Sequence, residues 1–290
     1  MTTEKHEVFL RLKAIELLAY WEGRLVTNRL MAWFGISRQQ ASADIKRYLE
    51  NHNPGSLVHD PSVKAYVPQP GFRPVLTANH INEYLDLVSG MASDSLATNL
   101  DVDSNLTVIQ FPDRALQSET VRKVITACRS QHSIKIQYAS MKNPTPSERI
   151  ISPHTLVHTG FRWHVRAYSH NKQQFNDFVL SRINGTPQPT PEDAPPLEED
   201  TLWQEIITLT LIPNNILNDK QRHLVAKDYG MSDNQLQIHV RKALIDYTLR
   251  RYRAAITAED ASDKSQPLIQ LLDSDREKVK PYLFDAGVNK

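Results

Sequence analysis

Charged side chains lie inside otherwise apolar, strand-like segments between residues 152 and 183. Arg166 and Arg182 carry planar guanidinium groups that fit phosphate oxygens. His154 and His164 carry rings that can stack on a base or donate a hydrogen bond. A strand needs no cations to fold, and a buried cation without a partner is costly. The pattern therefore predicts a pocket that binds an anionic ligand.

Other roles compete for the same side chains. Ion pairs with Glu148 or Asp177 would explain the arginines without any ligand. His154 and His158 could bind a metal, but their spacing of four suits a helix, and no Asp or Glu lies between Ile150 and Asn176. The Gly-x-Ser-x-Gly motif of serine hydrolases is absent from the sequence. We predict that the protein is not an enzyme, has no catalytic residues, and needs no cofactor or metal.

A second segment, residues 24–48, has five Lys or Arg and one Asp. Its apolar residues would form a small core between two crossed helices. Arg can pair with guanine and Gln with adenine, and the first turn of a recognition helix points into the major groove. Thr27, Arg47 and Lys64 suit phosphates. The predicted DNA-binding residues are Thr27, Ser37, Arg38, Gln39, Gln40, Ser42, Lys46, Arg47 and Lys64. An ordinary three-helix bundle with a polar outer face is the alternative.

The elements around this segment follow the order of a winged helix-turn-helix. Helices are predicted over residues 4–21, 27–34 and 37–49. Thr27 and Ser37 are the expected caps, and Gly35 suits the tight turn. Two extended runs between Leu57 and Pro68 flank a turn and predict the wing. We assign residues 1–74 to this DNA-binding domain and residues 75–116 to a linking helix, 77–91, and strand, 106–111.

The basic strands are predicted to pair as a hairpin closed by the two-residue turn Thr159-Gly160. Pairing His158 with Phe161 would give an apolar face that includes Trp163 and a basic face that includes Arg166. A slip of one residue would exchange the two faces. Trp163 is expected in the core, because it is the largest apolar side chain of the hairpin.

Charge is unevenly distributed along the 290 residues, whose net charge is +1. Residues 117–186 have 10 Lys or Arg against 3 Asp or Glu, which favours an anionic partner, although a solvated basic face is the alternative. Residues 187–200 have five prolines, five acids and no base, which is typical of an extended linker. Residues 201–290 follow in a strand-helix-strand-helix order that predicts a small α/β domain.

The composition, 40% hydrophobic and 23% charged, is that of a soluble globular protein. No apolar run has the length of a membrane span, and the first residues lack a signal-peptide core. Cys128 is the only cysteine, so no internal disulfide can form. We expect a cytoplasmic protein with no membrane partner.

The triplet Trp163-His164-Val165 resembles the one that names the WYL domain, a small Sm-like (SH3-like) β-barrel of bacterial transcription regulators. Here His and Val replace the family's Tyr and Leu. Ser181-Arg182-Ile183 is similar to the family's Asp-Arg-Ile segment, and Ser140 matches its pocket serine. The resemblance implies a WYL ligand-sensing domain over residues 117–186. Tyr138 and Ser140 would then add hydroxyl donors to the pocket.

The run from Ile151 to Val157, followed by the run from Arg162 to Tyr168, looks like a narrower subgroup, the BrxR- and CapW-type regulators of phage-defence operons. That resemblance implies a homodimeric repressor whose pocket binds a small anionic, nucleotide or oligonucleotide ligand. A homodimer also follows from the operator, because one recognition helix reads too few base pairs. Residues 201–290 are the expected dimerisation domain, and the helix at 77–91 is a second candidate for dimer contacts. The whole chain is a multidomain α+β protein.

Two alternatives stay open at this point. The ligand could release the protein from double-stranded operator DNA or promote its binding. The second domain could instead be an RNA- or single-strand-binding Sm-like module without operator-specific regulation, because its basic residues alternate with aromatic ones.

Overall fold

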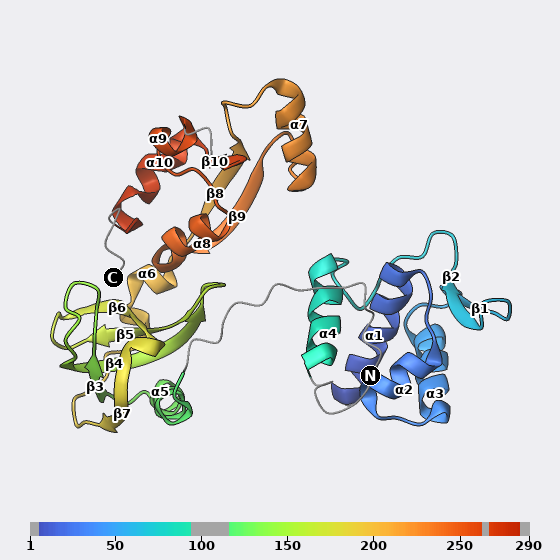
Figure 1. Ribbon diagram of the computed structural model, residues 1–290, viewed down its shortest axis with the longest axis horizontal. Helices are drawn as coiled ribbons and strands as arrows, with labels where there is room; N and C mark the ends of the chain where they lie inside the picture. The colour runs from blue at the N-terminus through green and yellow to red at the C-terminus, as the bar shows by residue number, and fades with distance from the viewer. Residues whose placement is uncertain (1–5, 94–115, 263–266, 285–290) are drawn as a thin grey trace. The chain divides into compact units, whose positions relative to one another are not determined.

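The computed structural model describes residues 6–93, 116–262 and 267–284 of the chain, which divides into two units, residues 1–110 and 111–290 (Figure 1). The predicted strand at 106–111 lies outside the described residues. Among the helices that are described, none has both the length and the apolar character needed to cross a membrane.

The first unit has the element order of a winged helix-turn-helix. Its elements are α1 (His6–Glu22), α2 (Thr27–Phe34), α3 (Arg38–Asn51), β1 (Leu57–Asp60), β2 (Ala65–Pro68) and α4 (Ile81–Ser93). Ser37 caps α3 as predicted, because its hydroxyl accepts a hydrogen bond from the backbone N–H of Gln40 at 3.1 Å. The predicted cap at Thr27 was wrong. Val26 holds the cap position of α2 without a side-chain hydrogen bond, and Thr27 is the first residue of the helix.

A buried carboxylate ties α1 to α3 and to the segment that precedes α4. Glu16 is fully buried. The hydroxyl of Tyr48 donates to it at 2.7 Å. The backbone N–H groups of Val75, Leu76 and Thr77 donate to it at 2.8 to 2.9 Å. Burial, together with the hydrogen bond to Glu16, raises the pKa of Tyr48, so the hydroxyl remains a donor.

The second unit starts with a helix and a five-stranded antiparallel sheet. These elements are α5 (Ser118–Ser130), β3 (Ile134–Tyr138), β4 (Ser147–His158), β5 (Trp163–Ser169), β6 (Gln174–Val179) and β7 (Ile183–Pro189). The strand order is β6-β5-β4-β3-β7, so no ladder joins the edge strands β6 and β7. The sheet is therefore open, and the closed barrel implied by the resemblance was wrong. A short 3-10 helix, Leu180–Arg182, follows β6 and carries the chain across to the far edge.

The open sheet is strongly curved. Its ladders are interrupted on β3 between Lys135 and Gln137, and on β4 between Pro153 and Thr155. Such bulges bend a strand and increase its twist. The curvature brings the end of β3 to the end of β6, although two strands separate them in the ladder. The backbone N–H of Val179 donates to the hydroxyl of Tyr138 at 3.1 Å.

The β4–β5 hairpin differs from its predicted register by two residues. His158 pairs with Trp163, and the turn between them contains four residues instead of two. Within the turn, the backbone N–H of Thr159 donates to the carbonyl of Arg162 at 3.2 Å. Between Thr155 and Arg166, a shift of two residues keeps the side chains on their predicted faces, because side chains alternate along a strand. His154 lies at the bulge and shares Asp200 with Arg166, so its predicted place on the apolar face was wrong. Trp163 was wrongly placed in the core: it is 43% exposed, beside His158 at the hairpin tip.

The proline-rich acidic segment is partly structured, unlike the extended linker that its composition predicted. β7 continues through Pro189, so it includes the first three residues of the segment. Asp200 at its other end is buried and caps the short helix α6 (Thr201–Gln204). The segment therefore ends at a fixed point in the sheet domain.

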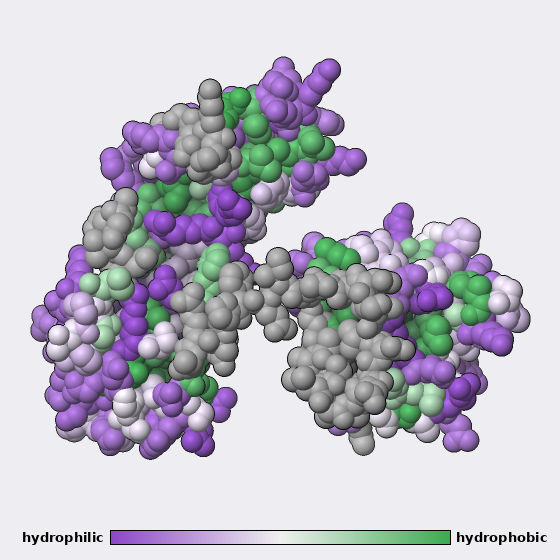
Figure 2. Space-filling view, in the orientation of Figure 1, coloured by the Kyte–Doolittle hydropathy of each residue, from purple (hydrophilic) through white to green (hydrophobic). Residues whose placement is uncertain are grey.

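The remaining residues form a second antiparallel sheet with helices packed on it. Its elements are β8 (Ile206–Pro213), α7 (Asp219–Asp228), β9 (Leu236–Arg241), α8 (Ile245–Arg251), α9 (Ala258–Ser262), β10 (Ile269–Leu271) and α10 (Asp273–Val279). The strand order is β10-β8-β9. The first four of these elements follow the predicted order, whereas α9, β10 and α10 were not predicted. Figure 2 shows that apolar residues gather over the β8–β9 sheet, while the five-stranded domain has a mostly hydrophilic surface.

Replacing Glu16 is expected to loosen the first unit. The Glu16→Ala variant leaves Tyr48 and three backbone N–H groups without their acceptor, at a cost of about 3 kcal/mol in the free energy of unfolding. Hydrogen exchange of the α1 and α3 amides measures this change. The control Glu50→Ala removes an exposed carboxylate of α3 and should change it by less than about 0.5 kcal/mol. Equal protection in both variants would contradict the role of Glu16.

Candidate ligand pocket and DNA-binding helix

Helix α3 presents the polar side chains predicted to contact DNA. Its exposed residues include Ser37 at the cap, then Arg38, Gln39, Gln40, Ser42, Lys46 and Arg47. Lys64 is exposed at the turn of the wing, where its φ is 51°. Thr27 is half-buried at the start of α2. The arrangement fits a helix that enters a major groove with a wing beside it.

Three of these side chains differ in how firmly they are held. Arg38 donates to Asn28 on α2 at 2.8 Å. Gln40 donates to Asp44 at 2.9 Å, and Arg11 on α1 holds the same carboxylate at 2.6 Å. Gln39 is exposed, and no hydrogen bond from its side chain to another described residue is observed. Gln39 is therefore the glutamine whose whole amide is available to a base edge.

A cavity of about 200 Å³ opens between the β3–β4 loop and strand β6. Its lining residues are Tyr138, Ser140, Lys142, Asn143, Arg149, Ser169, Lys172, Asn176, Asp177 and Phe178. The curvature of the sheet creates this cavity, because it brings the ends of β3 and β6 together. The ring of Phe178 lies edge-on to that of Tyr138 at 5.1 Å and forms an apolar floor.

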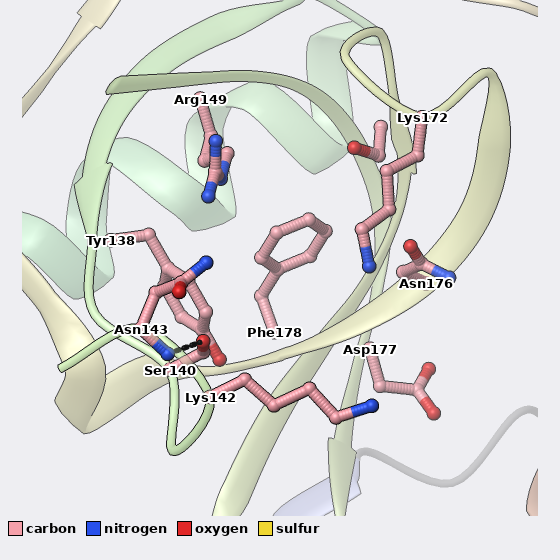
Figure 3. A pocket seen from close by; sticks show the side chains of 10 residues that line it. Tyr138, Ser140, Lys142, Asn143, Arg149, Lys172, Asn176, Asp177 and Phe178 are labelled. Carbon is pink, nitrogen blue, oxygen red and sulfur yellow. Dashed lines mark hydrogen bonds between the residues drawn. The ribbon is translucent and has the colours of Figure 1, made fainter. Parts of the chain in front are cut away.

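The cavity is lined by three cations and one carboxylate. Lys142, Arg149 and Lys172 come from the β3–β4 loop, from β4 and from the β5–β6 turn. Figure 3 shows their side chains arranged around Phe178 from different directions, with Asp177 below and to the right of the ring. Clustered positive charge with amide and hydroxyl groups beside it is the chemistry that binds phosphate or another small anion.

Two of the six predicted ligand-binding residues line this cavity, Tyr138 and Ser140. The hydroxyl of Ser140 accepts a hydrogen bond from the backbone N–H of Asn143 at 3.0 Å, which fixes the loop. The three cations of the cavity were not predicted individually. Their signal was the excess of basic residues between 117 and 186, which locates the domain but not the side chains.

Arg166 does not line the cavity, because two carboxylates hold it inside the sheet. It is 5% exposed. Its Nε and Nη2 donate to Asp200 at 2.7 and 2.9 Å, and its Nη1 donates to Asp177 at 3.2 Å. His154 also meets Asp200, with its Nε2 at 3.2 Å from the carboxylate. The competing explanation by ion pairing with Asp177 thus applies to Arg166, and Asp200 is a partner that the sequence did not suggest.

The same cluster controls the ionisation of Asp200. Burial alone would raise the pKa of this carboxyl, but hydrogen bonds from His154 and Arg166 outweigh burial and lower the pKa to about 2. The carboxylate therefore stays charged at neutral pH and keeps both partners. Removing Arg166 would take the guanidinium from between two buried carboxylates, which is strongly unfavourable.

His164 contacts the C-terminal domain. Its Nδ1 lies 3.1 Å from the hydroxyl of Tyr247 on α8, and that hydroxyl donates to Asp177 at 3.1 Å. Burial, with the positive charges of Arg162 and Arg182, lowers the pKa of His164 to about 4, so the ring is neutral at pH 7. The one hydroxyl proton goes to the carboxylate, so Nδ1 of His164 must donate to Tyr247.

Arg182 is half-buried in the 3-10 helix after β6. Its charge reaches His164, and its carbonyl accepts a hydrogen bond from the backbone N–H of Ala139 at 3.2 Å. Arg182, like Arg166, His154 and His164, is absent from the lining of the cavity. Within the described ranges, no three His, Cys, Asp or Glu side chains are grouped as around a metal ion.

Comparison with known proteins agrees with this layout. Three family models match in order: the BrxR transcriptional regulator winged helix-turn-helix domain at residues 7–90, the WYL domain at 119–186, and the BrxR transcriptional regulator C-terminal dimerization domain at 206–278. A DNA-binding transcriptional repressor CapW of Stenotrophomonas maltophilia is 32% identical over 83% of this chain and 81% of its own length. This chain belongs to the CapW family of transcriptional repressors.

Other members of the family are similarly related. CapW of Pseudomonas aeruginosa and CapW of Escherichia coli are each 31% identical over 94% of this chain and 91% of their own lengths. Among solved structures, proteasome accessory factor B/C of Arthrobacter aurescens aligns over 95% of this chain and 47% of its own, with 16% identity and a TM-score of 0.26, too low a likeness to support an argument. The range matched by the BrxR winged helix-turn-helix model, residues 7–90, includes most of α4.

The Gln39→Ala variant is expected to lose base preference at one or two positions of the operator, at a cost of about 1–3 kcal/mol in discrimination. The reason is that, among the residues the structure describes, no group is hydrogen-bonded to the Gln39 amide. Selection of bound duplexes from a random library measures the preference. The control Asn51→Ala changes the exposed last residue of α3 and should leave the selected sequence unchanged. An identical selected sequence for Gln39→Ala would remove Gln39 from the groove.

Acidification is expected to destabilise the second unit through His164. The pKa is about 4 in the folded protein against an ordinary value of 6.5, so the unfolded state binds more protons between these values. The stabilisation is fully present above pH 6.5 and is lost as the pH falls towards 4, on the order of 3 kcal/mol. Urea denaturation of the wild type and of His164→Asn measures it. The same pH dependence in both proteins would contradict this assignment.

Proposed function

We propose that this protein is a homodimeric repressor of a phage-defence operon, and that a small anion bound in the cavity beside Phe178 changes its affinity for operator DNA. The basic lining of that cavity is the observation that carries the proposal. The target operon follows from the resemblance to BrxR- and CapW-type regulators. The direction of the ligand's effect is left to the experiment.

DNA binding is supported by the exposed polar face of α3 and by the CapW relatives, whose names describe DNA-binding repressors. Arg38 and Gln39 occupy the first turn of α3, which is the part of a recognition helix that meets base edges. Lys64 is exposed on the wing and would contact phosphate, which would fix the position of the protein on the duplex.

Dimerisation is supported by the C-terminal domain. The family model that matches residues 206–278 describes a dimerization domain. Among the described residues of this range, the exposed large apolar side chains are Ile206, Ile216, Leu224 and Leu268. A partner surface that covered them would remove apolar area from water, which favours association. Two copies would present two recognition helices to a two-fold operator.

The ligand's size is limited by the cavity. Sites for drug-sized ligands have volumes of roughly 300–1,000 Å³. A cavity of about 200 Å³ is smaller. It suits a diphosphate or the phosphorylated end of a short oligonucleotide, with any further part of the ligand outside. Lys142, Arg149 and Lys172 would bind the phosphate oxygens, and Ser140 and Asn143 would add hydrogen bonds.

The ligand can control DNA binding only if it binds two arrangements of the protein with different affinity. A coupling of roughly 1–3 kcal/mol would change operator affinity about 5- to 150-fold. The full-length protein is therefore titrated with pyrophosphate and with a terminally phosphorylated dinucleotide at constant ionic strength. Its affinity for the intergenic DNA beside its own gene is measured with and without each probe.

The variant Lys142→Ala with Lys172→Ala should lose probe binding and keep operator binding without the probe. The control, Arg122→Ala with Lys123→Ala, removes two exposed cations from α5 in the same domain and should behave as the wild type. Probe binding that persists in the cavity variant, or operator affinity that no probe changes in the wild type, would overturn the proposal.

Single-strand binding by the β4–β5 hairpin is the second candidate function. Phe161 and Trp163 are 46% and 43% exposed, and the ring of His158 lies 4.7 Å from that of Trp163. Exposed aromatic rings near cations can stack on unpaired bases. If Trp163→Ala abolishes binding of a single-stranded oligonucleotide while duplex binding is absent in the wild type, this function replaces the repressor.

A further inference from the structure

Asp177 belongs to two features of the second unit at once. It is the one carboxylate among the residues that line the cavity. It also accepts a hydrogen bond from the hydroxyl of Tyr247 at 3.1 Å, and Tyr247 lies on α8 of the C-terminal domain. A single hydrogen bond therefore separates the wall of the cavity from the domain whose family match describes dimerization.

The hydrogen bonds around Asp177 have defined directions. Nδ1 of His164 donates to Tyr247, Tyr247 donates to Oδ2 of Asp177, and Nη1 of Arg166 donates to Oδ1 of Asp177. Arg166 in turn donates twice to Asp200, the residue that caps α6. The carboxylate of Asp177 thus helps to hold α8 directly, through Tyr247. It also helps to hold the start of the C-terminal segment indirectly, because Arg166 joins it to Asp200.

An anion in the cavity must act on Asp177, because like charges repel. Lys142, Arg149 and Lys172 attract the anion to a site where the carboxylate is its neighbour. The repulsion is reduced if Asp177 moves away from the cavity or if its carboxylate pairs with different nearby cations. Either change alters the acceptor that Tyr247 depends on.

Tyr247 has room to respond. Tyr247 lines a second cavity of about 240 Å³, together with Thr159, Phe161, Arg162, Asp246, Arg250 and Phe284. The hairpin turn contributes three of these residues and α8 contributes three. A residue that has a cavity beside it can change position without displacing a packed core.

We propose that Asp177 and Tyr247 transmit occupancy of the cavity beside Phe178 to helix α8 of the C-terminal domain, so that a bound anion changes how this domain is held against the sheet. The inference rests on the proposed function, since it assumes an anionic ligand in that cavity. Asp177 and Tyr247 act as positioning residues, because the ligand is bound by the cations.

The test compares Tyr247→Phe with the wild type as full-length proteins, using pyrophosphate and the terminally phosphorylated dinucleotide as probes. The variant removes the hydroxyl that joins His164 to Asp177 and leaves the ring in place. Probe affinity should stay within about twofold of the wild type, because no cation of the cavity is changed. The control Tyr252→Phe removes a hydroxyl just after α8 for which no hydrogen bond is observed among the described residues.

Hydrogen exchange of the α8 amides is the first readout. In the wild type and in Tyr252→Phe, a bound probe should change the exchange rates of α8, whereas in Tyr247→Phe the rates should be the same with and without probe. Affinity for the intergenic DNA is the second readout. In Tyr247→Phe, the ratio of the affinities measured with and without probe should be about one. Asp177→Asn removes the repelling charge. In this variant the probes should bind more tightly, and they should change the exchange rates of the α8 amides less than in the wild type.

The outcomes separate the two proposals. If the wild type binds a probe and α8 responds while DNA affinity does not change, the proposed function fails and the transmission stands. If Tyr247→Phe shows the same α8 response as the wild type, the transmission is overturned and the proposed function stands. If neither probe binds the wild type, both are overturned.

Discussion

A guanidinium buried inside a sheet must keep carboxylates beside it, and Arg166 imposes this constraint on the whole second unit. One of its partners, Asp177, is its cross-strand neighbour on β6. The other, Asp200, comes from the end of a proline-rich segment and starts α6. The two interactions fix the wall of the cavity and the entry to the C-terminal domain at one point. The sheet and the segment that follows it are therefore not independent parts.

This constraint also separates structural cations from those that can bind a ligand. A cation that has satisfied its charge with two buried carboxylates has little left for an incoming anion, and breaking those pairs costs several kcal/mol. The cations of the cavity come instead from two loops and from the start of β4, where water can reach them. Lys142 and Lys172 are exposed and Arg149 lines the same opening. Anion binding at the site thus depends on side chains in the loops and at the start of β4. The buried ion pairs of Arg166 inside the sheet keep these parts in position.

The local elements were predictable because their signals are local. Ser37 and Gly35 identify the turn before α3, and the apolar spacing of α1 identifies its buried face. Asp177 was foreseen as a partner of Arg166, but Asp200 was not predictable, because it lies 34 residues away in a segment whose composition indicates a linker. The register of the β4–β5 hairpin depends on a four-residue turn that a Thr-Gly pair does not specify. Trp163 was misplaced because size favours burial only where a partner surface exists, and the hairpin tip extends beyond the sheet.

A repressor that senses an anion must also distinguish that anion from DNA, which is itself a dense array of phosphates. Positive charge alone does not distinguish the two, because the excess of basic residues between 117 and 186 would attract a small anion and DNA alike. Shape does: a cavity of about 200 Å³ admits a small anion or a chain end, and a duplex cannot enter it. In the proposed function, the exposed residues of α3 and the wing would contact phosphates from outside, on a different unit of the chain. If the proposed function holds, a cavity on one unit and an exposed helix on the other would let phosphate groups serve both as operator backbone and as signal. The effect of the signal would then pass through packed side chains, and Asp177 and Tyr247 are the pair proposed for this role.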